Sequence, residues 1–155
     1  LFRSIPFIIL AMLLIPLTRF IVGTTIGIPG AIVPLVIATV PFFSRQVQLA
    51  LLEVDKGVIE ASIAMGCTPL EIIFRVYLKE GLPSLIRASS LTIISLIGLT
   101  TMAGAFGAGG IGNLAISRGY NRFQGDVIVV ATIIMLIIVF ISQAVGDFLE
   151  KRATK

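Results

Sequence analysis

Few side chains in this sequence have the type and spacing that covalent chemistry requires. The chain contains no histidine and one cysteine, Cys67, so a disulfide within the chain and a Ser–His or Cys–His pair are both excluded. Zinc sites are built mainly from cysteine and histidine, and this sequence lacks such a set. Asp126 and Asp147 lie only at the edges of apolar segments, so they do not make the paired acids of an intramembrane protease. We therefore expect no catalytic residue, no metal ion and no cofactor in this chain.

A glycine pattern offers the only match to a nucleotide-binding motif. Gly107, Gly109 and Gly112 fit G-x-G-x-x-G, but that motif binds a dinucleotide only after a strand and within a βαβ unit. Here the glycines follow a long apolar segment, which favours a flexible or tightly packed helix end followed by an external loop. The sequence has no G-x-x-x-x-G-K-[ST] motif, so ATP hydrolysis by the usual phosphate loop would need another chain.

The composition indicates the kind of molecule that carries these residues. The chain is 57% hydrophobic and 13% charged, with a mean hydropathy of +1.08, whereas soluble domains carry about 25% charge. Segments 5–22, 30–52, 84–107 and 127–146 are apolar and long enough for a hydrocarbon core of about 30 Å. We predict an all-α polytopic membrane protein with one transmembrane domain over residues 1–155 and four spans.

The basic residues predict which side of the membrane each segment faces. If residues 53–83 are cytoplasmic, both termini are too, and that side holds nine of the twelve basic residues. These nine are Arg3, Arg45, Lys56, Arg75, Lys79, Arg87, Lys151, Arg152 and Lys155. Arg19, Arg118 and Arg122 face the other side, in agreement with the positive-inside rule. Because the positive charge is spread between apolar segments, it does not indicate a nucleic-acid partner.

The third apolar segment is rich in small and hydroxylated residues. Three- and four-residue steps predict that a set of them shares one helix face. The set is Ala88, Thr92, Ser95, Gly98, Thr101 and Ala105. Two interpretations fit it: close packing of membrane helices, which small residues favour, or the lining of a polar pathway. In a dimer one face could serve both purposes.

Residues 53–83 are of mixed polarity and predict two short helices joined by an elbow. Residues 57–65 can form the first helix, and Gly66 suits the position of positive φ just past its end. Thr68, Pro69 and Glu71 have the spacing of an N-cap, a first-turn proline and a capping box for a second helix that runs to about Lys79. Such amphipathic helices could lie on the membrane surface or dock into a groove of a partner.

The same segment resembles a known motif. Glu60-Ala61-Ser62, followed by Gly66 and later by Val76 and Leu78, resembles the EAA loop (E-A-A-x₃-G-x₉-I-x-L-P) of ABC-importer permeases. RSIPFII, TRFIVGTTIG, AGAFGAGGIGN and GDFLEKR are most similar to the methionine-importer permease family. The sequence departs from the motif at Ser62, where alanine is expected, and at Lys79, where proline is expected.

The resemblance implies a type I ABC-importer permease fold and a transport function. Family members form homodimers in the bacterial inner membrane, contact separate ATP-binding-cassette ATPase subunits and receive substrate from a periplasmic or lipid-anchored binding protein. They have five spans, so we expect the first family span to be missing here. The residues that would contact the ATPase are Glu60, Ala61, Ser62, Met65, Gly66, Thr68 and Pro69. The candidate pathway or dimer face is Thr92, Ser95, Gly98, Thr101 and Ala105.

Three functions are consistent with these features. The first is alternating-access import of an amino acid, with methionine as the expected substrate, driven by a separate ATPase. The second is import of another small solute, such as an osmoprotectant or another amino acid. The third is an ATP-independent channel or secondary transporter, although the lack of acidic residues within the spans speaks against proton coupling.

Overall fold

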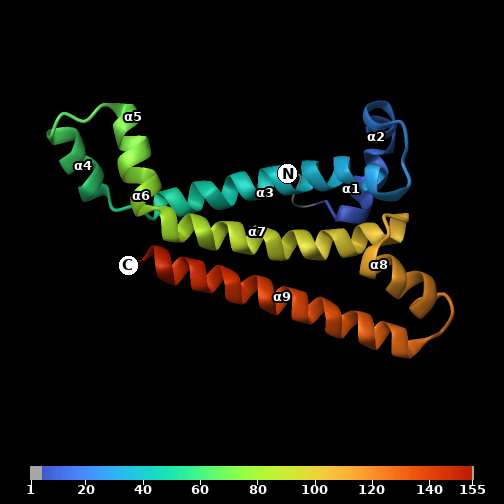
Figure 1. The fold of residues 1–155 in the computed structure, drawn as a ribbon. Coiled ribbons are helices and arrows are strands. Elements are labelled where there is room, and N and C mark those ends of the chain that lie inside the picture. The colour runs from blue at the N-terminus through green and yellow to red at the C-terminus, as the bar shows by residue number, and fades with distance from the viewer. Residues whose placement is uncertain (1–4, 155) are drawn as a thin grey trace.

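Three long helices lying side by side form the body of the molecule (Figure 1). The computed structural model describes residues 5–154, and this part of the chain is helical without strands. The long helices are α3 (Gly27–Leu52), α7 (Leu82–Ala103) and α9 (Gly125–Ala153), and α7 packs against both of the others. Shorter helices occupy the two ends of this body. The all-α prediction is confirmed.

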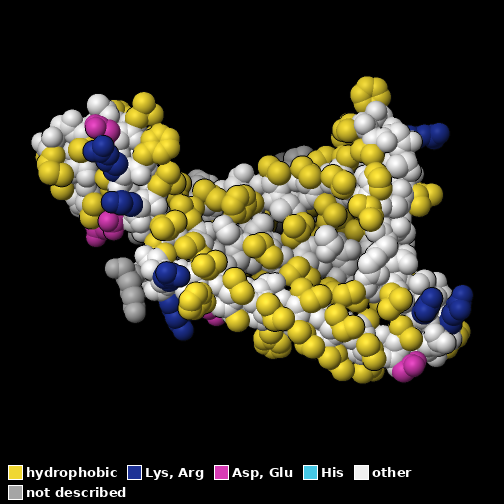
Figure 2. Space-filling model, viewed as in Figure 1, with side chains coloured by type: hydrophobic (Ala, Val, Ile, Leu, Met, Phe, Trp, Pro, Cys, Tyr) yellow, Lys and Arg dark blue, Asp and Glu magenta, His cyan; other side chains and the backbone are white. Residues whose placement is uncertain are grey.

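Each long helix has the length and polarity of a membrane span. Helix α3 has 26 residues, α9 has 29, and α7 with the turn that follows it has 25. At about 1.5 Å per residue, all three exceed a hydrocarbon core of about 30 Å. Figure 2 shows hydrophobic side chains along the long helices and charged side chains gathered toward the two ends. The chain is therefore a multi-pass membrane protein.

The segment expected as the first span, residues 5–22, is instead broken into two helices. Helix α1 (Phe7–Leu13) has 7 residues and α2 (Ile15–Val22) has 8, and the chain turns between them at Leu14. Pro16 has no N–H to continue the first helix, but it fits the first turn of the second. Neither helix is long enough to cross a bilayer, so this part of the four-span prediction is corrected to two short helices.

The two prolines of α3 do not interrupt their helix, in contrast to Pro16. Pro34 and Pro41 both lie inside this helix, yet it continues without interruption from Gly27 to Leu52. Pro34 is buried, so packing against neighbouring helices holds the backbone where a hydrogen bond is lost. Neither proline divides the helix.

The segment expected as an external loop, residues 112–123, is largely helical. The 3₁₀ turn η3 (Gly104–Phe106) ends α7, and α8 (Gly110–Leu114) and the π-helix η4 (Ala115–Tyr120) follow it. The Asn113 side chain donates a hydrogen bond to the carbonyl of Gly104 at 3.0 Å, and a β-carbon on Gly112 would overlap the backbone of Thr101. The glycine pattern is therefore a tightly packed helix end, one of the two alternatives that the sequence left open.

Candidate coupling site

Residues 56–80 form a helical hairpin that projects from the ends of α3 and α7 (Figure 1). Its first arm is α4 (Lys56–Ala64). Its second arm runs without a gap through α5 (Pro69–Glu71), the π-helix η2 (Ile72–Tyr77) and α6 (Leu78–Glu80). The two helices that the sequence predicted are thus present, and we call them together the α4–α6 hairpin.

The first arm is capped and packed by polar side chains. Asp55 is its N-cap and accepts a hydrogen bond from the N–H of Gly57 at 2.6 Å. Ser62 is 5% exposed, and its hydroxyl donates to the carbonyl of Val58 at 2.7 Å. The serine that replaces the motif's alanine is therefore accommodated, because its one added polar atom has a partner in the same helix.

Gly66 forms the elbow with the conformation predicted from the sequence. Its φ is +82°, its N–H donates to the carbonyl of Ile63 at 2.9 Å, and the N–H of Cys67 donates to the carbonyl of Ser62 at 3.1 Å. This pair of hydrogen bonds is a Schellman motif, which satisfies the last carbonyls of the helix. A β-carbon on Gly66 would meet nothing within 4 Å, so the elbow faces open space.

The second arm begins with the predicted capping box. The N–H of Thr68 donates to Glu71 Oε2 at 2.9 Å, the N–H of Glu71 donates to the Thr68 hydroxyl at 3.4 Å, and Pro69 occupies the first turn. The backbone hydrogen bond from Thr68, assisted by its hydroxyl, lowers the pKa of Glu71. The carboxylate therefore stays ionised at neutral pH and keeps the helix start in place.

The rest of the second arm shows one feature that sequence reasoning missed. Residues 72–77 form a π-helix, in which the backbone is wider than in an α-helix, and no local sequence signal pointed to it. The arm then continues through Lys79 to Glu80, and the N–H of Gly81 closes it on the carbonyl of Tyr77 at 3.0 Å. With Lys79 in place of the motif's proline, the helix continues one residue beyond the end predicted at about Lys79.

Most residues predicted to contact a partner lie on the surface of the hairpin. Glu60, Ala61, Met65, Gly66, Thr68 and Pro69 are exposed, whereas Ser62 is buried. Met65 is 76% exposed at the tip, and Leu70 and Phe74 are exposed on the second arm. Helices that present apolar side chains in this way can dock in a groove, and the adjacent Glu60 adds a charge for recognition.

The candidate pathway residues of α7 are divided between two sides of the helix. Thr92 and Ser95 line a groove of about 320 Å³ together with residues of α1 and α3. Thr101 instead lies toward α9, with its hydroxyl 3.7 Å from the sulfur of Met135, while Gly98 and Ala105 are exposed. The expectation of one shared face is corrected, because Thr92 and Thr101 are nine residues apart, about two and a half helical turns.

The hydroxyl groups on α7 also have local partners. Thr92 donates to the carbonyl of Ala88 at 2.8 Å, and Thr101 donates to that of Ile97 at 2.9 Å. Such bonds to the preceding turn satisfy hydroxyls in an apolar environment. Whether these residues line a pathway or a dimer contact stays a prediction.

Comparison with known proteins places this architecture among transport components. The family model described as "Binding-protein-dependent transport system inner membrane component" matches residues 1–155. The chain is 52% identical over 148 residues to the methionine import system permease protein MetP of Bacillus subtilis, covering 96% of this chain and 67% of that protein. It is 49% identical over 150 residues to the probable D-methionine transport system permease protein MetI of Pasteurella multocida, covering 97% and 69%.

A solved structure agrees with the same fold. The native crystal form of the MetNI methionine ABC transporter in inward-facing conformations contains a chain that superposes with a TM-score of 0.95. The sequence identity is 46%, and the match covers 99% of this chain and 71% of that chain. The arrangement of the long helices and the α4–α6 hairpin is therefore that of a transporter subunit.

Proposed function

Because the chain belongs to the family of binding-protein-dependent transport system inner membrane components, we propose that it is the permease subunit of an ATP-driven methionine importer. The observation that carries this proposal is the exposed, capped α4–α6 hairpin in a chain about half identical to methionine permeases. The permease does no covalent chemistry. It alternates between outward and inward access while a separate chain hydrolyses ATP.

In this proposal the hairpin receives the movement of the ATPase. Met65 and Leu70 enter an apolar groove of the ATPase, and Glu60 pairs with a basic group at its edge. The capping box and the Gly66 elbow hold the two arms at a fixed angle, so that displacement of the tip moves the ends of α3 and α7. Two copies of the chain enclose the pathway, and a substrate-binding protein delivers methionine from outside.

The first prediction concerns the side on which the hairpin lies. We expect it to face the cytoplasm together with both chain ends, as the distribution of basic residues favours. Cys67, the sole cysteine of the sequence, lies in the elbow and reports this directly. A membrane-impermeant thiol reagent should leave Cys67 unlabelled in intact cells and label it after permeabilisation.

The control for this measurement is Arg122→Cys in a Cys67→Ser background. Arg122 is exposed in the turn between η4 and α9, and Figure 1 shows the start of α9 at the end of the long helices opposite to the hairpin, so this cysteine should be labelled in intact cells. If Cys67 were labelled in intact cells and Arg122→Cys were protected, the hairpin would lie on the outer side of the membrane, and the predicted orientation would be wrong.

The second prediction concerns the substrate. The tagged permease should co-purify with an ATPase subunit, and the complex reconstituted in vesicles with its binding protein should accumulate methionine only when ATP is present. A complex that accumulates an osmoprotectant or another amino acid in place of methionine would support the second function above. Reproducible absence of an ATPase subunit would support the ATP-independent alternative.

A further inference from the structure

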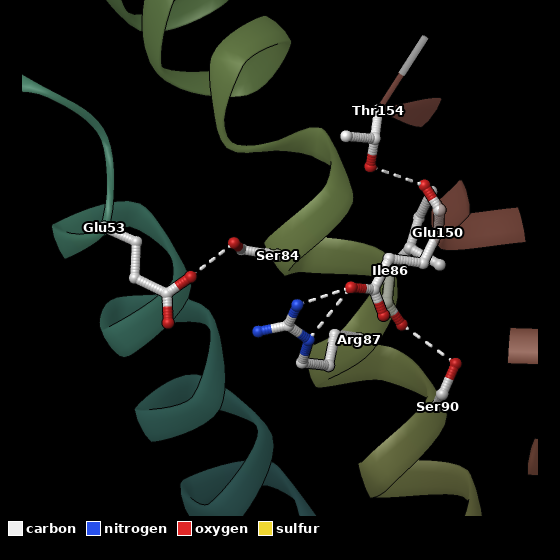
Figure 3. A network of polar contacts seen from close by, with 7 residues as sticks. All are labelled: Glu53, Ser84, Ile86, Arg87, Ser90, Glu150 and Thr154. Atoms are coloured by element: carbon white, nitrogen blue, oxygen red, sulfur yellow. Dashed lines mark hydrogen bonds and ion pairs between the residues drawn. The ribbon is translucent and has the colours of Figure 1, made fainter. Parts of the chain in front are cut away.

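The three long helices end close together at the base of the α4–α6 hairpin, where polar side chains connect them (Figure 3). The Ser84 hydroxyl at the start of α7 donates a hydrogen bond to Glu53 Oε2 at the end of α3, at 2.5 Å. One turn further along α7, Arg87 donates from Nε at 3.1 Å and from Nη2 at 2.5 Å to Glu150 Oε1 of α9. A single turn of α7 thus contacts both neighbouring helices through polar side chains.

The contact between α7 and α9 differs from the contact between α7 and α3, because α9 has no covalent connection to the hairpin. The hairpin is covalently joined to α3 through Glu53 and to α7 through Gly81, so its displacement reaches these two helices through the backbone. Helix α9 only ends near this place and has no direct chain link to the hairpin. Among residues 5–154, the Arg87–Glu150 contact is the sole ion pair, although the chain carries twelve basic and eight acidic residues.

Close packing supports the polar contacts from within the bundle. A β-carbon on Gly146, one turn before Glu150, would lie 2.6 Å from Ser90 Cβ, so the backbones of α7 and α9 approach closely there. On the other side, a β-carbon on Gly81 would lie 3.4 Å from side-chain atoms of both Leu51 and Val54. Helix α7 is therefore packed against each neighbour at the level where the polar contacts form.

We propose that Glu53, Ser84, Arg87 and Glu150 form a three-helix clamp that makes α9 move with α3 and α7 when the hairpin is displaced. Arg87 and Glu150 are then positioning residues for transport, since they transmit movement without touching ATP or substrate. This role rests on the function proposed above. The alternative is that Arg87 and Glu150 only neutralise each other's charge at the membrane edge. In that case their removal would affect stability but leave the coupling between ATP hydrolysis and uptake unchanged.

The first test compares variants in the complete transporter reconstituted in vesicles with methionine. Arg87→Ala and Glu150→Ala should each lower the methionine taken up per ATP hydrolysed by about twofold to fivefold, the range for a partly exposed ion pair. Recovery of the ATPase with the permease should be unchanged, because the hairpin surface is intact. The exchange Arg87→Glu with Glu150→Arg should restore most of the ratio. Arg152→Ala, at an exposed position of the same helix end, is the matched control and should have no effect.

The second test uses the purified permease and does not depend on the substrate. Spin labels at Leu82→Cys and Leu149→Cys, both exposed, report the distance between α7 and α9 in a Cys67→Ser background. This distance distribution should be narrow with the native pair, broad in Arg87→Ala and narrow again in the charge exchange. A narrow distribution in Arg87→Ala, or an uptake ratio that stays at the native value in both alanine variants, would overturn the clamp. Absence of uptake by the native complex would instead count against the proposed function.

Discussion

Replacing Gly66 with aspartate should lower both ATPase recovery and ATP-dependent uptake by about tenfold or more. Gly66 has a φ of +82°, where a β-carbon costs about 1–2 kcal/mol, and each 1.4 kcal/mol corresponds to about tenfold in an equilibrium. The added carboxylate would also project into the open space at the elbow, where the ATPase is proposed to bind. The thermal unfolding temperature of the isolated permease should stay near the native value, because Gly66 lies between α4 and α5, which project beyond the bundle of long helices (Figure 1).

Two further variants distinguish strain in the backbone at Gly66 from obstruction of the proposed ATPase-binding surface by the added side chain. Gly66→Ala adds a β-carbon at positive φ without the carboxylate, so it should lose docking about as much as Gly66→Asp if the strained backbone dominates, and less if the carboxylate does. Gly125→Asp adds the same side chain at an exposed glycine with no atom within 4 Å and no positive φ, and it should leave uptake unchanged. Native ATPase recovery and uptake in Gly66→Asp would instead favour a hairpin that lies on the membrane surface.

The elbow could be predicted because its signals are local. A capping box needs only Thr68 and Glu71 three residues apart, and a helix that ends in the left-handed conformation favours glycine, here Gly66. Both features depend on hydrogen bonds within a few residues, so distant parts of the chain do not override them. The π-helix of residues 72–77 has no such signal, because its residue types are equally suited to an α-helix.

Features that depend on distant contacts could not be predicted. Arg87 and Glu150 are 63 residues apart, and the sequence showed each only as a charge at the end of an apolar segment. Their pairing follows from the packing of α7 against α9 with Gly146 at the contact, which no periodicity reveals. The division of residues 5–22 has a local cause instead, because Pro16 begins a new helix just after the turn at Leu14, although the segment is apolar enough for a span.

The divided face of α7 has a geometrical cause. A step of three residues falls about 60° short of a full helical turn, so the three successive three-residue steps from Thr92 through Ser95 and Gly98 to Thr101 drift by about half a turn around the axis. The step from Thr92 to Ser95 preserves the side, whereas the distance from Thr92 to Thr101 brings the side chain to the opposite surface. Residues spaced by three or four in the sequence are therefore reliably predicted to be neighbours on the helix. The same spacing does not reliably predict that all of them share one surface over five turns.

The glycines at the end of α7 should have the largest effect on stability. A β-carbon on Gly112 would overlap the backbone carbonyl of Thr101, and one on Gly104 would overlap the backbone N–H of Asn113. Backbone atoms cannot turn away as a flexible side chain can, so Gly112→Ala must separate α8 from α7. Overpacking of this kind costs about 3 kcal/mol. At about 2–4 °C per kcal/mol for a protein of this size, the unfolding temperature of the purified permease should fall by about 6–12 °C.

Gly125→Ala is the matched control for this prediction, because Gly125 is a helical glycine of α9 where an added β-carbon would meet no atom within 4 Å. Alanine favours helix more than glycine does, so Gly125→Ala should unfold at or slightly above the native temperature. Unfolding of Gly112→Ala at the same temperature as Gly125→Ala would contradict the close approach of α8 to α7. A lower temperature for Gly112→Ala alone would mean that the third glycine of the G-x-G-x-x-G pattern serves helix packing, since Gly112 is where the backbones of α8 and α7 touch.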